Sequence, residues 1–264
     1  MMTFNFDLIS DLHIETWEHD IDWAGMATSP VCVVAGDISS DRKLVVETLR
    51  QLGKAYQAVF YIDGNDEHQQ HLNNLDISYA DLITRINKLP NVVYLQDNVV
   101  VIDGVAILGT NGWWTFDFDI SVDAVESALW YQDKFSLKDQ AIATITRMGT
   151  EDAMYMVNSV KKLQTHKDVK KIVMVTHTVP NPELIEHDID LDGTSKFNTM
   201  GNTYISQALD ADTEGKIHTW CFGHYHGSVD QYRNGVRYVN NCRGRGDTSY
   251  SKYVYYPQRI VIDY

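Results

Sequence analysis

Long apolar runs, cysteine pairs and basic segments are all scarce in this sequence, and each absence excludes a class of protein. No run is apolar and long enough to span a bilayer, and no signal-peptide pattern opens the chain. The three cysteines, Cys32, Cys221 and Cys242, are widely spaced and form no CxxC pair. We therefore expect neither a disulfide framework nor a structural zinc knuckle, and we expect a reducing, cytoplasmic setting.

Positive charge is also in short supply. Aspartate and glutamate number 36 against 22 lysines and arginines, which gives a formal net charge of −14. Such a field repels nucleic acid and anionic lipid, so we expect no extended nucleic-acid partner and no membrane partner. Bound cations would offset part of this charge, because metal ligands are often acids.

No internal repeat, low-complexity tract or linker rich in proline and glycine divides the 264 residues. We expect one domain over residues 1–264, which is long enough to bury a sizeable core. Apolar runs predict strands at 4–9, 31–35, 59–62, 171–176, 216–222 and 253–264, with hairpins at 98–108 and 228–240. Helical patterns cover 41–58, 66–89 and 203–210. A helical insertion of two helices is expected at about 121–165.

This alternation predicts an α/β layered fold, in which functional residues gather in loops beyond the carboxyl ends of strands. Metal-ligand residue types follow predicted strands at five places. They are Asp11-Leu12-His13, Gly36-Asp37, Gly64-Asn65-Asp66-Glu67, Thr176-His177 and Gly223-His224-Tyr225-His226. Each of the first four blocks alone is also typical of a turn, a helix cap or a core histidine, whereas His224 and His226 between two glycines are more typical of a metal clamp. Together, each after a strand, they are improbable as unrelated turns.

The chemistry of these donors narrows the choice of ligand. Two aspartates, one asparagine and four histidines are enough to hold two metal ions. Oxygen and imidazole donors without thiolate suit Mn²⁺, Fe or Zn²⁺. Two such ions predict a water molecule activated for attack on a phosphorus ester.

The order and spacing of the blocks resemble those of the calcineurin-like metallophosphoesterases, in particular their compact bacterial or phage-type members. The family pattern is Asp-x-His, Gly-Asp, Gly-Asn-His, a lone histidine and Gly-His-x-His, and the blocks of this chain extend from Asp11 to His226. Asn241-Cys242-Arg243-Gly244 is similar to the Asn-Pro-Arg-Gly of such members. The resemblance implies a four-layer αββα sandwich, with two mixed β-sheets flanked by helices.

The resemblance also implies a dinuclear centre of divalent ions, with manganese favoured over iron, zinc or nickel. The implied ligands of the first metal are Asp11, His13, Asp37 and His226. Those of the second metal are Asp37, Asn65, His177 and His224, with Asp37 bridging. A hydroxide activated by the metals would attack phosphorus in line with the leaving oxygen. The implied enzyme is a phosphodiesterase or phosphatase that acts on a small phosphorylated substrate.

One position departs from the family pattern. The family has a histidine after the motif asparagine, where it assists the leaving group, and this chain has Asp66. A carboxylate cannot donate a proton at neutral pH unless its pKa is raised, and it repels a dianionic monoester more than a diester. We therefore expect a preference for phosphodiesters or activated esters. The catalytic candidates are Asn65, Asp66 and His68, although His68 is more typical of an ordinary residue at the start of the next helix.

Several alternatives stay open on the sequence. The chain could be a binding protein that keeps the fold without hydrolysis, or a nuclease of the same superfamily, which the net charge disfavours. Trp113 and Trp114 either form an aromatic wall at the site or pack in the core. Arg243 and Arg245 either bind phosphate or are surface charges. The oligomeric state is not predicted.

Overall fold

Strands and helices alternate along the chain, and the strands form two sheets. The computed structural model describes residues 2–18, 21–118, 123–185, 196–246 and 254–264. The first sheet has the order β11 (Gln258–Asp263), β1 (Thr3–Ile9), β2 (Val31–Ala35), β3 (Ala58–Ile62) and β4 (Val92–Tyr94). Its strands β1 to β4 are parallel, and β11 pairs antiparallel with β1.

The second sheet has parallel strands at its centre and an antiparallel strand at each edge. Its order is β5 (Asn98–Ile102), β6 (Val105–Thr110), β7 (Lys171–Thr176), β8 (Ile217–Phe222), β10 (Val236–Asn240) and β9 (Asp230–Arg233). The strands β6, β7, β8 and β10 are parallel, whereas β5 and β9 are antiparallel to their neighbours. Both predicted hairpins are confirmed, and their turn residues Asp103-Gly104 and Asn234-Gly235 have positive φ, as two-residue hairpin loops require.

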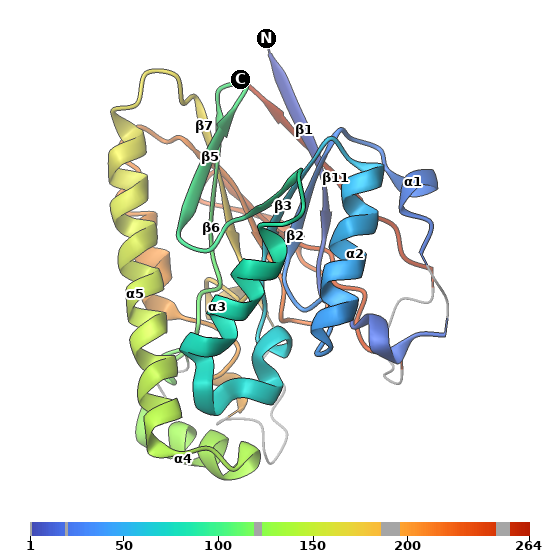
Figure 1. Cartoon of the computed structure of the whole chain (residues 1–264). Helices are drawn as coiled ribbons and strands as arrows, with labels where there is room; N and C mark the ends of the chain where they lie inside the picture. The colour runs from blue at the N-terminus through green and yellow to red at the C-terminus, as the bar shows by residue number, and fades with distance from the viewer. Residues whose placement is uncertain (1, 19–20, 119–122, 186–195, 247–253) are drawn as a thin grey trace.

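The helices lie outside the two sheets. They are α1 (Trp23–Met26), α2 (Arg42–Ala55), α3 (Leu75–Ile86), α4 (Ala124–Phe135) and α5 (Asp139–Gln164). Short 3₁₀ segments are η1 (Ile14–Thr16), η2 (Asp66–Asn74), η3 (Pro182–Leu184) and η4 (Thr203–Ala208). In Figure 1, α5 runs along one side and α2 lies on the other, with strands between them.

Three buried clusters hold these layers together. Between the sheets, Leu8 and Val33 of the first pack with Ile107 and Val173 of the second. The outer face of the first sheet packs against the apolar faces of α2 and α3. The outer face of the second sheet packs against α5, which contributes residues such as Met156. The predicted αββα sandwich of two mixed sheets is therefore confirmed.

The sequence pattern is wrong in one helix. The predicted helix over 66–89 is divided into η2 and α3, with a non-helical backbone at His71. The cause lies at its start, where Glu67 accepts backbone hydrogen bonds from Ile38 and Gly64 and so belongs to the strand-end loops. The two helices predicted within 121–165 are present as α4 and α5, and residues 121–122 lie outside the described part.

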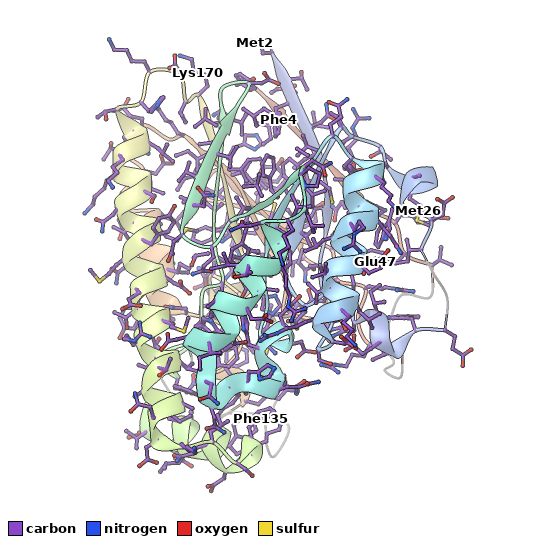
Figure 2. The ribbon with its side chains drawn as sticks, viewed as in Figure 1. Met2, Phe4, Met26, Glu47, Phe135 and Lys170 are labelled. Carbon is purple, nitrogen blue, oxygen red and sulfur yellow. The ribbon has the colours of Figure 1, made fainter. Side chains whose placement is uncertain are left out.

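The parallel strands of both sheets direct their carboxyl ends toward the same end of the molecule. Figure 2 shows Met2 and Lys170, which precede β1 and β7, at one end, and Phe135 of α4 at the opposite end. The loops that follow β1 and β7 therefore lie at the α4 end. Among the described residues, no helix combines the length and apolarity that a bilayer crossing requires.

Candidate metal centre

The structure brings all seven predicted metal ligands together at the carboxyl ends of the strands. Asp11 and His13 follow β1, Asp37 follows β2, Asn65 follows β3, His177 follows β7, and His224 and His226 follow β8. Each sheet thus supplies part of one constellation, in which two groups of side chains can each hold a metal ion.

The first group consists of Asp11, His13 and His226. The Nε2 atoms of His13 and His226 lie 3.0 Å apart, and Asp11 Oδ1 lies 3.6 Å from His226 Nε2. Asp11 and His13 are fully buried, whereas the His226 side chain is 28% exposed. The group therefore opens to solvent on the side of His226.

The second group consists of Asp37, His177 and His224, with Asn65 beside them. His177 Nε2 lies 3.1 Å from Asn65 Oδ1 and 3.2 Å from His224 Nδ1. Asp37 lies between the groups, because its Oδ1 is 3.4 Å from His177 Nε2 and its Oδ2 is 4.0 Å from His13 Nε2. This is the position that a bridging carboxylate requires.

Hydrogen bonds behind the site fix which ring nitrogen of each histidine faces the cluster. His177 donates through Nδ1 to the carbonyl of Ala35, at 3.0 Å, so in the neutral ring its Nε2 is an acceptor that faces the cluster. His224 donates through Nε2 to the carbonyl of Thr199, at 3.0 Å, and its Nδ1 is left as an acceptor. Such backbone contacts orient metal-binding imidazoles and set their tautomers.

These residues fit metal ions by the chemistry of their donor atoms. If both rings were neutral, in the tautomers that Ala35 and Thr199 select, His177 and His224 would turn two lone pairs toward each other, so either a proton on His177 or a metal cation has to separate them. Asp11 Oδ2 is buried and has no hydrogen-bond partner among the residues that the structure describes. A buried carboxylate oxygen without a partner is costly unless a charge compensates it. The assignment of individual ligands to two metals stays a prediction.

The backbone at the site is bent into unusual conformations. Asp11, His13, Asp37 and His224 all have positive φ, between 41° and 64°. Left-handed backbone at non-glycine residues costs free energy and is concentrated at functional sites. Gly36 (φ +84°) meets a further restriction, because a Cβ atom there would collide with the ring of His177.

The sequence did not indicate the role of Glu67, which holds two ligand loops in place. Its buried carboxylate accepts hydrogen bonds from the backbone N–H groups of Asp37, Ile38 and Gly64, at 3.2, 2.8 and 2.9 Å. Burial raises the pKa of Glu67 well above its usual range, and the Asp37 charge acts in the same direction. In the sequence, the only signal for this loop-holding role of Glu67 is its position in the block Gly64-Asn65-Asp66-Glu67.

The charges of the site change the pKa values of the ligands themselves. Burial opposes the charged form of His177, but Asp37 and Asp11 outweigh it and raise the pKa of His177 to about 10. Burial and the neighbouring His177 lower the pKa of His224 to about 3. One histidine of the second group is therefore charged and the other neutral when no metal is bound.

Asp66 does not stand free at the site. Its carboxylate accepts a hydrogen bond from Asn65 Nδ2 (2.9 Å), lies 3.2 Å from His13 Nδ1 and forms an ion pair with Arg245. The Asp66 side chain is 3% exposed and that of Arg245 is 35% exposed. Sequence reasoning missed this pair, because the two residues are 179 positions apart.

The backbone N–H of His68 donates to the carbonyl of Asn65, but the His68 side chain contacts core residues instead of the other predicted site side chains. Its Nε2 contacts Asp63 Oδ2 and its Nδ1 contacts Ser78 Oγ, both at 2.7 Å. The ring is fully buried and stacked on Tyr79. Both nitrogens are thus engaged in the core, and neither is left for a substrate.

The remaining aromatic and basic candidates divide between core and site. Trp113 is buried and donates to Tyr79, as core packing predicts. Trp114 is also buried, but its ring stacks on His224 at 5.6 Å between centroids, so it supports a predicted ligand. Arg243 is buried with its guanidinium carbon 3.9 Å above the Trp17 ring, so it is not a surface charge.

No protein-family model and no curated protein matches the sequence. Solved structures are similar in fold. A phosphopantetheinyl hydrolase from Mycobacterium tuberculosis matches with a TM-score of 0.68 and 18% identity, over 91% of this chain and 89% of that chain. A putative 5'-nucleotidase from Staphylococcus aureus matches with a TM-score of 0.53 and 13% identity, over 99% of this chain and 51% of that chain.

A third structure, described as the anchor in the inner membrane complex of Plasmodium, has a TM-score of 0.53 and 10% identity, over 95% of this chain and 75% of that chain. At these identities the likeness concerns the fold. The chain has the fold of the calcineurin-like metallophosphoesterases, in agreement with its motif pattern.

Proposed function

We propose that this chain is a metal-dependent phosphoester hydrolase with a dinuclear centre. The observation that carries the proposal is the position of Asp37, whose two carboxylate oxygens face two separate groups of histidine and aspartate side chains. Two divalent ions, with Mn²⁺ favoured, would supply an activated water and would neutralise charge on the phosphoryl oxygens.

The residues of the chain would divide the work as follows. Asp11, His13 and His226 would hold one ion and Asn65, His177 and His224 the other, with Asp37 between them. The carbonyls of Ala35 and Thr199 keep two of the imidazoles in the required tautomer. Because the site opens on the side of His226, we propose that the substrate enters there.

The proposed substrate preference for phosphodiesters or activated esters needs a changed reason. Arg245 compensates the charge of Asp66, so repulsion of dianionic monoesters no longer argues for diesters. No histidine stands at position 66 to protonate a leaving group, and His68 is engaged in the core. This reason favours activated esters, whose leaving groups depart without a proton, and it does not distinguish diesters from monoesters.

The substrate panel should include an ester of phosphopantetheine, because one structural neighbour is described as a phosphopantetheinyl hydrolase. We propose this compound as a candidate only, since the likeness to that neighbour concerns the fold. A putative nucleotidase among the neighbours adds a nucleoside monophosphate to the same panel.

Hydrolysis by metal-stripped protein tests the proposal. Mn²⁺, Zn²⁺ or Mg²⁺ is added back, and turnover of bis-p-nitrophenyl phosphate and p-nitrophenyl phosphate is measured beside the panel. We expect metal-dependent turnover that is absent in Asp37→Ala and retained in Arg233→Ala, whose exposed arginine pairs with Glu183. A turnover rate that does not depend on added metal, or that is retained in Asp37→Ala, would contradict the proposal.

The second candidate is a catalytically weak or inactive binding protein on the same fold. It is favoured by Asp66 in place of histidine and by the neighbour described as an anchor. Stoichiometric metal binding without turnover of any ester in the panel would favour this alternative over hydrolysis.

A further inference from the structure

We infer that Arg245 binds a phosphoryl oxygen of the substrate and that Asp66 positions Arg245 for this task. The inference rests on the proposed function and assigns to an aspartate–arginine pair the place that a histidine takes in the family pattern. Arg245 is the substrate-contacting residue in this scheme, and Asp66 is a positioning residue.

The first step of the argument is the location of the pair. Asp66 is buried, and it contacts both the ring of His13 (3.2 Å) and the side-chain amide of Asn65 (2.9 Å). Arg245 pairs with the same carboxylate. Its guanidinium is therefore separated from two predicted metal ligands by one side chain only.

The second step is the solvent exposure of Arg245. Its side chain is 35% exposed, whereas that of Asp66 is only 3% exposed, so the pair extends from the interior to the surface of the site. The ring of His13 connects the pair to the open side of the site, because its Nδ1 lies 3.2 Å from the Asp66 carboxylate and its Nε2 lies 3.0 Å from His226 Nε2. Arg245, which pairs with Asp66, therefore lies on the side of the site where His226 is exposed.

The third step is charge. Asp37 is buried between the two groups of ligands, and an approaching phosphate meets its negative charge. A planar guanidinium offers paired donors that match phosphate oxygens. Arg243 cannot serve in the same way, because it is buried against Trp17. Arg245 is thus the arginine of this segment that is both anchored at the site and exposed.

Phosphate affinity tests the inference without relying on turnover. Binding of inorganic phosphate to Mn²⁺-loaded protein is measured by calorimetry for the wild type and for Arg245→Ala, Arg245→Gln and Arg245→Lys. Loss of a charge-assisted hydrogen bond predicts that the Ala and Gln variants bind phosphate about 10- to 100-fold more weakly. Lysine should recover part of the affinity, because it restores the charge without the planar fork.

Arg233→Ala is the matched control. Arg233 has a side-chain exposure of 36%, close to that of Arg245, and it pairs with Glu183. Its removal should leave the phosphate affinity unchanged. Equal affinities in the wild type, Arg245→Ala and Arg245→Gln would overturn the inference, and so would a wild type that binds no phosphate.

The positioning role of Asp66 is tested by a double-mutant cycle. At equal metal content, Asp66→Asn should weaken phosphate binding about as much as Arg245→Ala, and the double variant should be no weaker than either. Additive losses would show that Asp66 does not act through Arg245. These binding measurements test the inference separately from the proposed function. Phosphate binding that depends on Arg245, without turnover of any ester, would refute hydrolysis but would support the inference.

Discussion

Buried carboxylates organise this molecule at the scale of single residues, and they do so in different ways. Glu67 joins the loops after β2 and β3 through three backbone N–H groups. Asp152 on α5 accepts from the backbone N–H groups of Gly112 and Trp113 and from the side chains of Gln96 and Thr110. A carboxylate can accept several hydrogen bonds at once, so it can replace regular secondary structure in a buried loop.

Asp152 should make stability depend on pH. Burial raises its pKa from an ordinary 3.8 to about 7. Between these values the folded protein holds the proton more tightly than the unfolded chain, so the contribution of Asp152 to the free energy of unfolding falls as pH rises from about 4 to about 7. The slope approaches ~1.4 kcal/mol per pH unit.

Urea denaturation of the wild type and Asp152→Asn at several pH values measures this slope. The variant should lose the dependence, and it should carry a roughly constant penalty of about 1–3 kcal/mol because its NH₂ group faces a backbone donor. Parallel stability curves for the two proteins from pH 4 to pH 7 would contradict the assignment.

His68→Gln should affect folding rather than chemistry. The ring links Asp63 to Ser78 in the core, and its loss leaves buried partners unsatisfied, at a cost of about 1–3 kcal/mol in the free energy of unfolding. The measurement is urea denaturation beside turnover per folded molecule. If His68→Gln has unchanged stability but loses turnover, His68 takes part in catalysis and this prediction is wrong.

Single residues also show where sequence reasoning ends. The seven predicted ligands were recognisable because each stands in a short motif beside a strand, and such motifs are local. The sequence predicts that Asp66 repels a dianionic substrate, because its partner Arg245 is 179 positions away and is not recognisable as such from a local pattern. Contacts between distant residues depend on how the sheets pack, and no local pattern encodes them.

At the scale of elements, the junction between β2 and its loop is the most restricted point. Gly36 has φ +84°, and a Cβ atom there would collide with His177; Gly235 has the same φ, but a Cβ atom there has nothing within 4 Å. Gly235→Ala should therefore cost only the left-handed backbone penalty, about 1–2 kcal/mol.

Gly36→Ala should destabilise the protein by more than Gly235→Ala and should also weaken metal binding, because the His177 ring must move. Thermal unfolding and Mn²⁺ titration of both variants separate the backbone cost from the collision. Equal losses in both variants, with equal metal affinity, would show that His177 is not held by this contact.

The elements themselves followed from local pattern wherever one face is apolar. The strand Val31–Ala35 and both hairpins were predicted at the observed places, since alternation and turn residues are local signals. The continuous helix predicted over 66–89 is not observed, because Glu67 accepts hydrogen bonds from the backbone of the loops after β2 and β3. Tertiary contacts override helix propensity at that point.

At the scale of the whole molecule, metal binding should stabilise the fold. The site combines buried acids that follow strands of the first sheet with histidines that follow strands of the second. An ion bound only by the folded state adds ~2.7 kcal/mol to the free energy of unfolding at a free concentration of 100 times its Kd. For a chain of this size we expect a rise in Tm of roughly 5–10 °C. Differential scanning calorimetry with Mn²⁺ and then with a chelator measures the rise and its reversal. Asp37→Ala should show little of it, and an equal rise in that variant would place the bound metal elsewhere.

The division of the ligands between the two sheets has a consequence for biosynthesis. Asp11, Asp37 and Asn65 leave the ribosome early, on strands of the first sheet, whereas His177, His224 and His226 follow strands of the second. A nascent chain that ends before β7 holds Asp11, Asp37 and Asn65 without the three histidines of the second sheet. The complete metal site therefore forms only during the last third of translation. A bound metal then indicates that the two sheets have packed against each other.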